Sequence, residues 1–165
     1  MTFMDIRKEV LEILKKDSLI ANDVIAKMLE IDEAEAAAAR KALEEEGIIM
    51  RYSVLVNTEK QQDGPAEALI ELKVAPQRDF GYDDIARRVY NFPEVKSVYL
   101  VSGRYDLAVL VEAKTMKAIS QFVWEKLAVL EGIASTETIF IMRKYKEHGE
   151  IMVGSSKVDR LVVTP

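Results

Sequence analysis

The segment 101–106, VSGRYD, places opposite charges close together in a short turn. The guanidinium of Arg104 can hold a carboxylate with two parallel hydrogen bonds, and the carboxylate of Asp106 can accept hydrogen bonds from an ammonium group. A cation and an anion at this spacing suit a zwitterion such as an amino acid. Gly103 permits a tight turn next to them. A hairpin with ordinary solvated charges is the simpler interpretation, and these residues taken alone favour it.

A second polar segment, Ser135-Thr136-Glu137-Thr138, lies at the start of the last predicted strand. Hydroxyl groups beside a carboxylate could bind a small polar ligand. The strand propensity of threonine explains the same residues equally well.

Most catalytic chemistry is excluded by composition. The 165 residues include no cysteine and one histidine, His148, which lies in a polar tail. Disulfides, thiolate metal sites and cysteine nucleophiles are therefore excluded. No pair of residues is placed for acid and base catalysis, so we expect no enzyme, no metal and no cofactor.

Charge and hydropathy limit the partners and the cellular compartment that can be expected. The chain has 23 basic and 28 acidic residues, and residues 1–60 hold 9 and 13 of them. The acidic excess thus lies mainly in the N-terminal third. No run approaches the ~18 apolar residues of a membrane helix, and charges occupy the place of a signal peptide's apolar core. We expect a cytoplasmic protein without membrane contact.

The pattern of the first 57 residues predicts three helices followed by two short strands or one bent strand. Apolar spacing predicts a helix over about 3–16, and Asn22 is a plausible N-cap for a second. Asp32 and Glu35 have the spacing of a capping box for a third, which Gly47 would end. Residues 48–57 then read as two short strands or one bent strand. Two helices joined by a short turn and followed by a β-ribbon form a winged helix-turn-helix, which docks in the DNA major groove. A three-helix packing domain without a ligand fits equally well.

The polar stretch 57–65, which ends in Gly-Pro, is the best linker in the chain. We therefore predict four parts: a helix-turn-helix domain over 1–56, the linker over 57–65, a second domain over 66–146 and an extension over 147–165. In the extension, Ile151–Val153 and Leu161–Val163 could add an edge strand or cross to a partner.

Residues 66–146 predict a ferredoxin-like βαββαβ domain and an α+β fold. The expected strands cover 66–75, 95–102, 105–113 and 133–144, with helices over about 81–91 and from Thr115 to Gly132. Several strands are apolar on both faces, whereas one layer of helices covers only one face. A second copy of the sheet is the simplest cover for the other face, so we expect a homodimer.

Three segments, in this order and spacing, are similar to the Lrp/AsnC family of leucine-responsive and asparagine-synthetase regulatory proteins, the feast/famine regulators. The segments are ALEEEGIIMRYSVLVN (42–57), FPEVKSVYLVSGRYDLAVLVEA (92–113) and ASTETIFIMRKYK (134–146). The resemblance covers about residues 3–146.

The resemblance implies a transcriptional regulator of amino-acid-related metabolism. Its N-terminal winged helix-turn-helix would bind double-stranded DNA. Its C-terminal ligand-sensing domain, called RAM, would dimerise through its sheets, and the dimers would assemble to octamers. The effector, usually an amino acid, would bind between dimers near the glycine-containing turn. The implied effector residues are Gly103, Arg104, Tyr105 and Asp106, with Thr136 and Thr138 as further candidates.

The composition of the predicted third helix argues against DNA binding. Residues 33–46, EAEAAAARKALEEE, hold two basic and five acidic residues, although Lys and Arg contacts to phosphate supply most nonspecific affinity for DNA. Alanines stand where base-reading residues are expected, and they can at most touch a thymine methyl. A modest basic patch could still form from Lys27, Arg40, Lys41 and Arg51. The alternative is an effector-binding oligomer with weak or lost DNA binding that acts through a protein partner.

Overall fold

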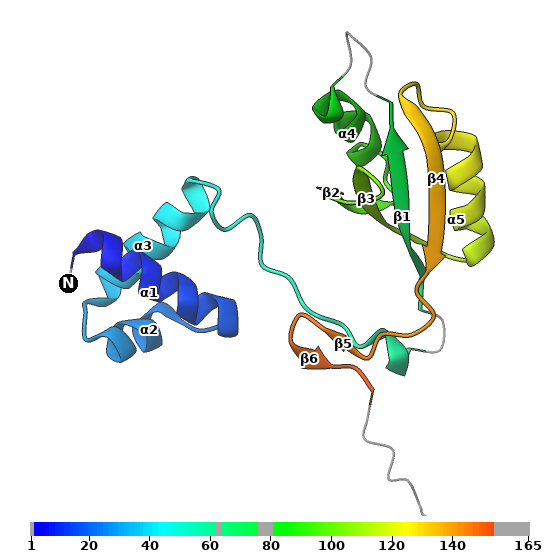
Figure 1. The fold of residues 1–165 in the computed structure, drawn as a ribbon. Helices are drawn as coiled ribbons and strands as arrows, with labels where there is room; N and C mark the ends of the chain where they lie inside the picture. Colours follow the sequence, from blue (N-terminus) through cyan, green and yellow to red (C-terminus); the bar gives the residue numbers. More distant parts are fainter. Residues whose placement is uncertain (1, 62–63, 76–80, 154–165) are drawn as a thin grey trace, which may run out of the picture. The chain divides into compact units, whose positions relative to one another are not determined.

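The computed structural model describes residues 2–61, 64–75 and 81–153. The chain divides into two compact units, residues 1–55 and 56–165 (Figure 1). Among the described residues, none of the helices is both long enough and apolar enough to cross a bilayer.

The first unit is a three-helix domain. Its helices are α1 (Phe3–Lys16), α2 (Asn22–Leu29) and α3 (Glu33–Glu45), so the three predicted helices are confirmed. One apolar stripe of each helix faces a shared core, as the 3.6-residue spacing requires. The buried core residues are Ile6, Val10, Leu14, Ile25, Ala26, Ala36, Ala39 and Leu43.

The ends of α3 follow the predicted signals, but the start of α2 does not. Glu35 accepts a hydrogen bond from the backbone N–H of Asp32 at 3.2 Å. Beyond the other end, Gly47 has a φ of +69°, a conformation in which glycine meets no steric cost. Asn22 was predicted as an N-cap, and this is wrong. Ala21 occupies the cap position, while Asn22 opens the helix and its side chain accepts a hydrogen bond from Arg40.

The strand or strands predicted over 48–57 do not form. Residues 50–57, which we call the exit segment, have no ladder partner among the described residues. Strand-forming side chains such as Tyr52 and Val54 are there, but they are exposed to solvent. A strand exists only when a second strand satisfies its backbone groups, and the residues of this segment pair neither with one another nor with another described strand.

The second unit has the predicted βαββαβ order. Its elements are β1 (Ala66–Val74), α4 (Tyr82–Tyr90), β2 (Val95–Leu100), β3 (Leu107–Ala113), α5 (Met116–Phe122), the π-helical turn η2 (Val123–Leu127) and β4 (Ile133–Phe140). The strands form one antiparallel sheet in the order β2-β3-β1-β4, with β1 in register with both β3 and β4. This is the strand order of a ferredoxin-like fold.

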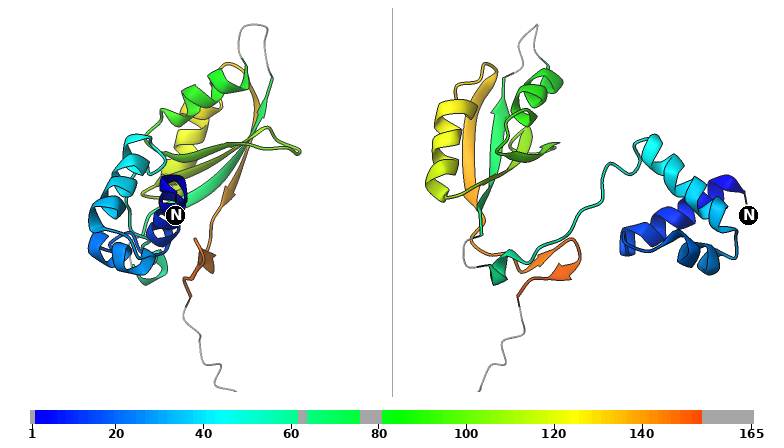
Figure 2. Two further views of the ribbon diagram at one scale, coloured as in Figure 1. Left: turned by 90° about the vertical axis from the view of Figure 1, so that its left-hand side faces the viewer. Right: turned by 180° about the vertical axis from the view of Figure 1, so that it is seen from behind.

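The core of this unit lies between the helices and one face of the sheet (Figure 2). Alternate residues of β1 and β3 are buried there, together with Ile85 and Val89 of α4 and Ile119 and Phe122 of α5. The opposite face carries the intervening residues of β1 and β3 and their partners on β2 and β4, among which Tyr99 and Ile139 are exposed apolar side chains. The sheet thus presents one covered and one open face.

The segment expected to act as a linker contains the short 3-10 helix η1 (Thr58–Lys60). The carboxylate of Glu59 accepts a hydrogen bond from the backbone N–H of Lys144 at 3.1 Å. Later in the sequence but beside this segment, β5 (Lys146–Glu147) and β6 (Glu150–Ile151) form a separate hairpin (Figure 1). Ile151 therefore pairs with Lys146 rather than adding to the edge of the main sheet. Leu161–Val163 lie outside the described residues.

Candidate functional site

Helices α2 and α3 are joined by the three residues Glu30–Asp32, a turn length typical of a helix-turn-helix. Glu30 ends α2 with a φ of +55°. Lys27 on α2 and Lys41 on α3 both point to solvent, with side chains 76% and 73% exposed. Each is paired with a carboxylate one turn away, at 3.0 Å for Asp23 and 3.5 Å for Glu45. Such exposed pairs contribute little to stability, so a phosphate can replace the carboxylate at little cost.

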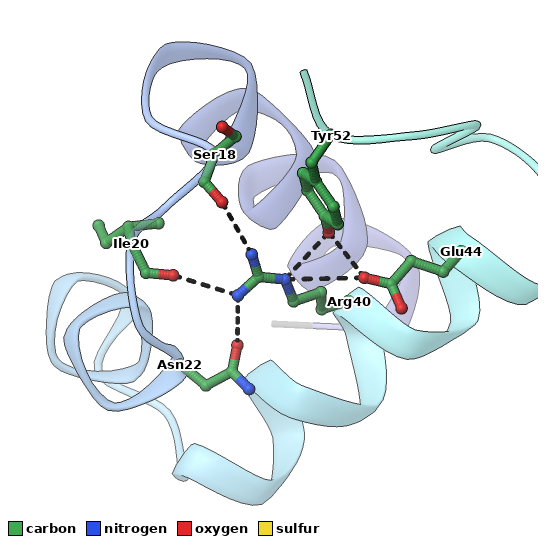
Figure 3. Close-up of polar contacts among 6 residues, drawn as sticks. All are labelled: Ser18, Ile20, Asn22, Arg40, Glu44 and Tyr52. Carbon is green, nitrogen blue, oxygen red and sulfur yellow. Dashed lines mark hydrogen bonds and ion pairs between the residues drawn. The ribbon is translucent and has the colours of Figure 1, made fainter. Parts of the chain in front are cut away.

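Arg40 lies differently from the other predicted DNA contacts. Its side chain is 20% exposed, and its guanidinium points into the unit (Figure 3). Nη2 donates to the carbonyl of Ser18 at 3.0 Å, and Nη1 donates to the carbonyl of Ile20 and the side chain of Asn22, both at 3.1 Å. The structure therefore does not bring Arg40 together with Lys27 and Lys41 on an exposed surface.

The position of Arg40 on α3 explains this arrangement. Arg40 follows Ala36 by four residues and precedes Leu43 by three, and both of these residues are buried. Helical geometry places all three on one face. That spacing was a signal in the sequence for an inward-pointing arginine. Arg51, in contrast, lies exposed in the exit segment.

The base of loop 101–106 is fixed by Asp106. Its carboxylate accepts hydrogen bonds from the backbone N–H of Val74 at 2.8 Å and from Lys73 Nζ at 3.2 Å. Its side chain is only 16% exposed. The N–H of Val74, and then Lys73, hold the pKa of Asp106 below its usual value. Asp106 thus ties the start of β3 to the end of β1, and each of its oxygens keeps lone-pair capacity for a further donor.

The tip of the same loop is open to solvent. A Cβ at Gly103 would meet no atom within 4 Å, and the φ of Gly103 is not in the left-handed region. Within one chain, neither space nor backbone conformation requires a glycine at position 103 for the predicted tight turn. The guanidinium carbon of Arg104 lies 5.5 Å from the ring centre of Tyr105, a cation–π distance. The Tyr105 hydroxyl donates to the carboxylate of Glu137, and this bond raises the pKa of Tyr105.

The remaining predicted residues, Thr136 and Thr138, lie on the face of β4 that is turned away from Tyr105. Thr136 and Thr138 lie opposite the buried Leu72 and Ile70 of β1, which places both threonines on the helix-covered face. Glu137 lies between them and points to the open face, where Tyr105 contacts it. Within one chain, the structure brings Tyr105 to Glu137 and does not bring it to the threonines.

Glu71 adds a second carboxylate beside this contact. It lies directly across from Glu137 in the register of β1 and β4. The charges of Arg104, Glu137 and Glu71 all act on Tyr105, so the loop tip faces groups of both signs. Over the described residues, no group of three or more His, Cys, Asp or Glu side chains could hold a metal ion.

Comparison with known proteins matches both units. Residues 5–50 match the family model for a winged helix-turn-helix DNA-binding domain. Residues 67–151, just over half of the chain, match the model for the Lrp/AsnC ligand binding domain. The chain is 40% identical over 159 residues to the uncharacterized HTH-type transcriptional regulator YugG of Bacillus subtilis, covering 95% of each chain.

Two solved structures show the same fold. A transcriptional regulator from Neisseria meningitidis, crystallised in complex with L-Met, matches with a TM-score of 0.70 and 23% identity, over 86% of this chain and 91% of that one. AsnC from E. coli matches with a TM-score of 0.69 and 18% identity, over 87% and 94%. On the match to the ligand-binding domain and the identity to the relative, this chain belongs to the Lrp/AsnC family of DNA-binding transcriptional regulators, a family of regulators and not of enzymes.

Proposed function

We propose that this regulator controls genes of amino-acid-related metabolism, and that an amino acid bound near the tip of loop 101–106 modulates its binding to double-stranded DNA. The observation that carries the proposal is the loop itself. Asp106 fixes its base, and its tip carries Arg104 near the carboxylates of Glu71 and Glu137. These charges can bind both ends of a zwitterion. Gly103 and Tyr105 complete the proposed contact surface.

The relative crystallised with L-Met supports an amino acid as the class of effector. Arg104 would hold the carboxylate, and Glu137, with Glu71 beside it, would hold the ammonium group. Asp106 shapes the loop in this proposal. Thr136 and Thr138 lie on the other side of their strand, so they would shape β4 or contact an effector held by another subunit.

We further propose that the chain forms a homodimer through the open face of its sheet and that dimers assemble to an octamer. Tyr99 and Ile139 give that face apolar side chains that a second copy would cover. An effector at contacts between dimers would change the assembly and thereby the spacing of the DNA-binding domains, which must match the helical repeat of DNA.

Lys27, Lys41 and Arg51 are the proposed DNA contacts. The test is binding of fragments of the source genome by the purified protein at ~50 mM and ~200 mM salt, with and without a mixture of amino acids. Retention of discrete fragments, with a steep loss at the higher salt, is expected. If nothing is retained at either salt, with or without amino acids, the proposed function is wrong.

A specific observation favours a second candidate, an effector-binding oligomer with weak or lost DNA binding that acts through a protein partner. Helix α3 carries exposed glutamates at both ends, Lys41 is paired with Glu45, and Arg40 is engaged internally. This candidate predicts that the protein binds amino acids in calorimetry but retains no DNA. A sequence-specific footprint would eliminate it.

A further inference from the structure

The Arg40 guanidinium joins three parts of the first unit that are separate in sequence. It binds the connection between α1 and α2 through Ser18 and Ile20, and it binds the first residue of α2. Its Nε donates to the hydroxyl of Tyr52, in the exit segment, at 3.0 Å. Because a guanidinium has five N–H donors, these four bonds leave one.

Tyr52 is held by this guanidinium and by α3. Its hydroxyl accepts from Arg40 and donates to Glu44 Oε1 at 2.7 Å, and its ring centre lies 5.1 Å from the guanidinium carbon (Figure 3). Partial burial raises the pKa of Tyr52, which favours the protonated hydroxyl that donates to Glu44. Although Tyr52 is 42% exposed, the exit segment is fastened to α3 at this residue.

We propose that Arg40 and Tyr52 are positioning residues for DNA recognition, which together fix α3 to the α1–α2 connection and to the exit segment without touching DNA. The proposal rests on the proposed DNA binding by α2 and α3. The planar guanidinium donates in fixed directions, so α3 cannot rotate or slide without breaking several bonds at once. A two-pronged contact to phosphate needs two parallel donors, and Arg40 has one left.

Charge and geometry can be separated by substitution. Arg40→Lys keeps the positive charge but replaces the fork by a single ammonium group, whereas Arg40→Gln removes the charge as well. A phosphate contact would survive the first change far better than the second. If Arg40 positions α3 instead, the two substitutions should lower the affinity for DNA by nearly the same factor. Tyr52→Phe removes only a hydroxyl from a partly exposed ring and is the variant most certain to fold.

The experiment uses the full-length protein and a genomic fragment that the wild type retains. Affinity is measured from ~50 to ~200 mM salt for the three variants and for Lys41→Gln, an exposed neighbour on α3. Trypsin cleavage after Arg51 is timed in parallel and identified by mass, because this bond adjoins Tyr52. Tyr90→Phe, an exposed tyrosine of the second unit, is the control for loss of a hydroxyl.

We expect Arg40→Lys, Arg40→Gln and Tyr52→Phe each to lower affinity by about two- to tenfold, the equivalent of one or more lost hydrogen bonds, with the salt slope unchanged. Cleavage after Arg51 should accelerate by a similar factor. Lys41→Gln should reduce the salt slope by about one if Lys41 contacts phosphate.

Two results would overturn the proposal. One is near wild-type affinity for Arg40→Lys together with a reduced salt slope for Arg40→Gln, which would make Arg40 a phosphate contact. The other is a Tyr52→Phe variant with unchanged affinity and unchanged cleavage after Arg51. If the wild type itself retains no fragment, the proposed function fails and the positioning role fails with it, while the cleavage rates still decide whether Tyr52 fastens the exit segment.

Discussion

Gly132 occupies the position at which a single methyl group should do the most damage to the second unit. It follows the helical segment that ends at η2, directly before β4, and its φ is +92°. A Cβ at this position would lie 2.6 Å from Cδ1 and 3.3 Å from Cγ1 of Ile85. Ile85 is buried in the core, so its side chain has little room to withdraw.

The expected cost of Gly132→Ala has three parts. The left-handed backbone costs a non-glycine residue about 1–2 kcal/mol. Forcing Ile85 off its rotamer or overpacking the core costs about 1–3 kcal/mol. Restricting the unfolded chain returns about 0.4–1 kcal/mol. The free energy of unfolding should therefore fall by about 1–4.5 kcal/mol.

The assay is urea unfolding at a fixed protein concentration, followed by fluorescence of Trp124. This is the one tryptophan of the chain, and it lies in the second unit. Gly103→Ala is the matched control, since its Cβ would meet no atom and its φ is ordinary. It should change stability by less than about 0.5 kcal/mol.

Ile85→Val supplies the second test because it removes the Cδ1 atom that the new methyl group would meet. Alone it should cost about 0.5–1.5 kcal/mol. Combined with Gly132→Ala, it should cost about 1 kcal/mol less than the sum of the two single changes. Strict additivity of the pair, or a Gly132→Ala cost below about 0.5 kcal/mol, would refute this account of the turn.

Three further predictions concern the sites described above. The pKa of Asp106 is depressed in the fold, so its ionised carboxylate stabilises the protein fully above the ordinary pKa of 3.8, and this stabilisation is lost as the pH falls below that value. Asp106→Asn should therefore make the free energy of unfolding less dependent on pH between about pH 2 and 6. Tyr105→Phe removes the donor to Glu137 and should shift the amino-acid concentration that alters DNA binding by about threefold or more, with melting temperature nearly unchanged. Lys144→Met leaves the mostly buried Glu67 without its cation and should cost about 1–3 kcal/mol in urea unfolding, part of which Glu67→Gln should restore.

The helices and strands were largely predictable because local signals decide them. The 3.6-residue spacing of apolar side chains located α1, the capping-box spacing of Asp32 and Glu35 located the start of α3, and glycine after α3 located its end within a residue. Period-2 alternation located β1. The strand predicted over 48–57 failed because strand propensity does not provide a pairing partner.

The candidate sites were predictable as segments but not as sets of contacts. Loop 101–106 could be selected from its glycine and its opposite charges. The sequence order of Thr136, Glu137 and Thr138 did not reveal that the middle residue faces the loop and the outer two face the helices. That division follows from the register of β4 against β1, which depends on residues more than sixty positions away.

The sequence by itself determined the order of elements, the βαββαβ arrangement, the absence of thiol chemistry and the acidic third helix, because each depends on residue types and short-range spacing. Only the tertiary structure decided what the charges do. Arg40 was predicted to contact DNA and Asp106 to contact an effector, yet both form hydrogen bonds with backbone groups and side chains of this chain that folding brings close. A charged group near the core must be satisfied by whatever lies beside it, and that neighbourhood is set by packing rather than by sequence distance.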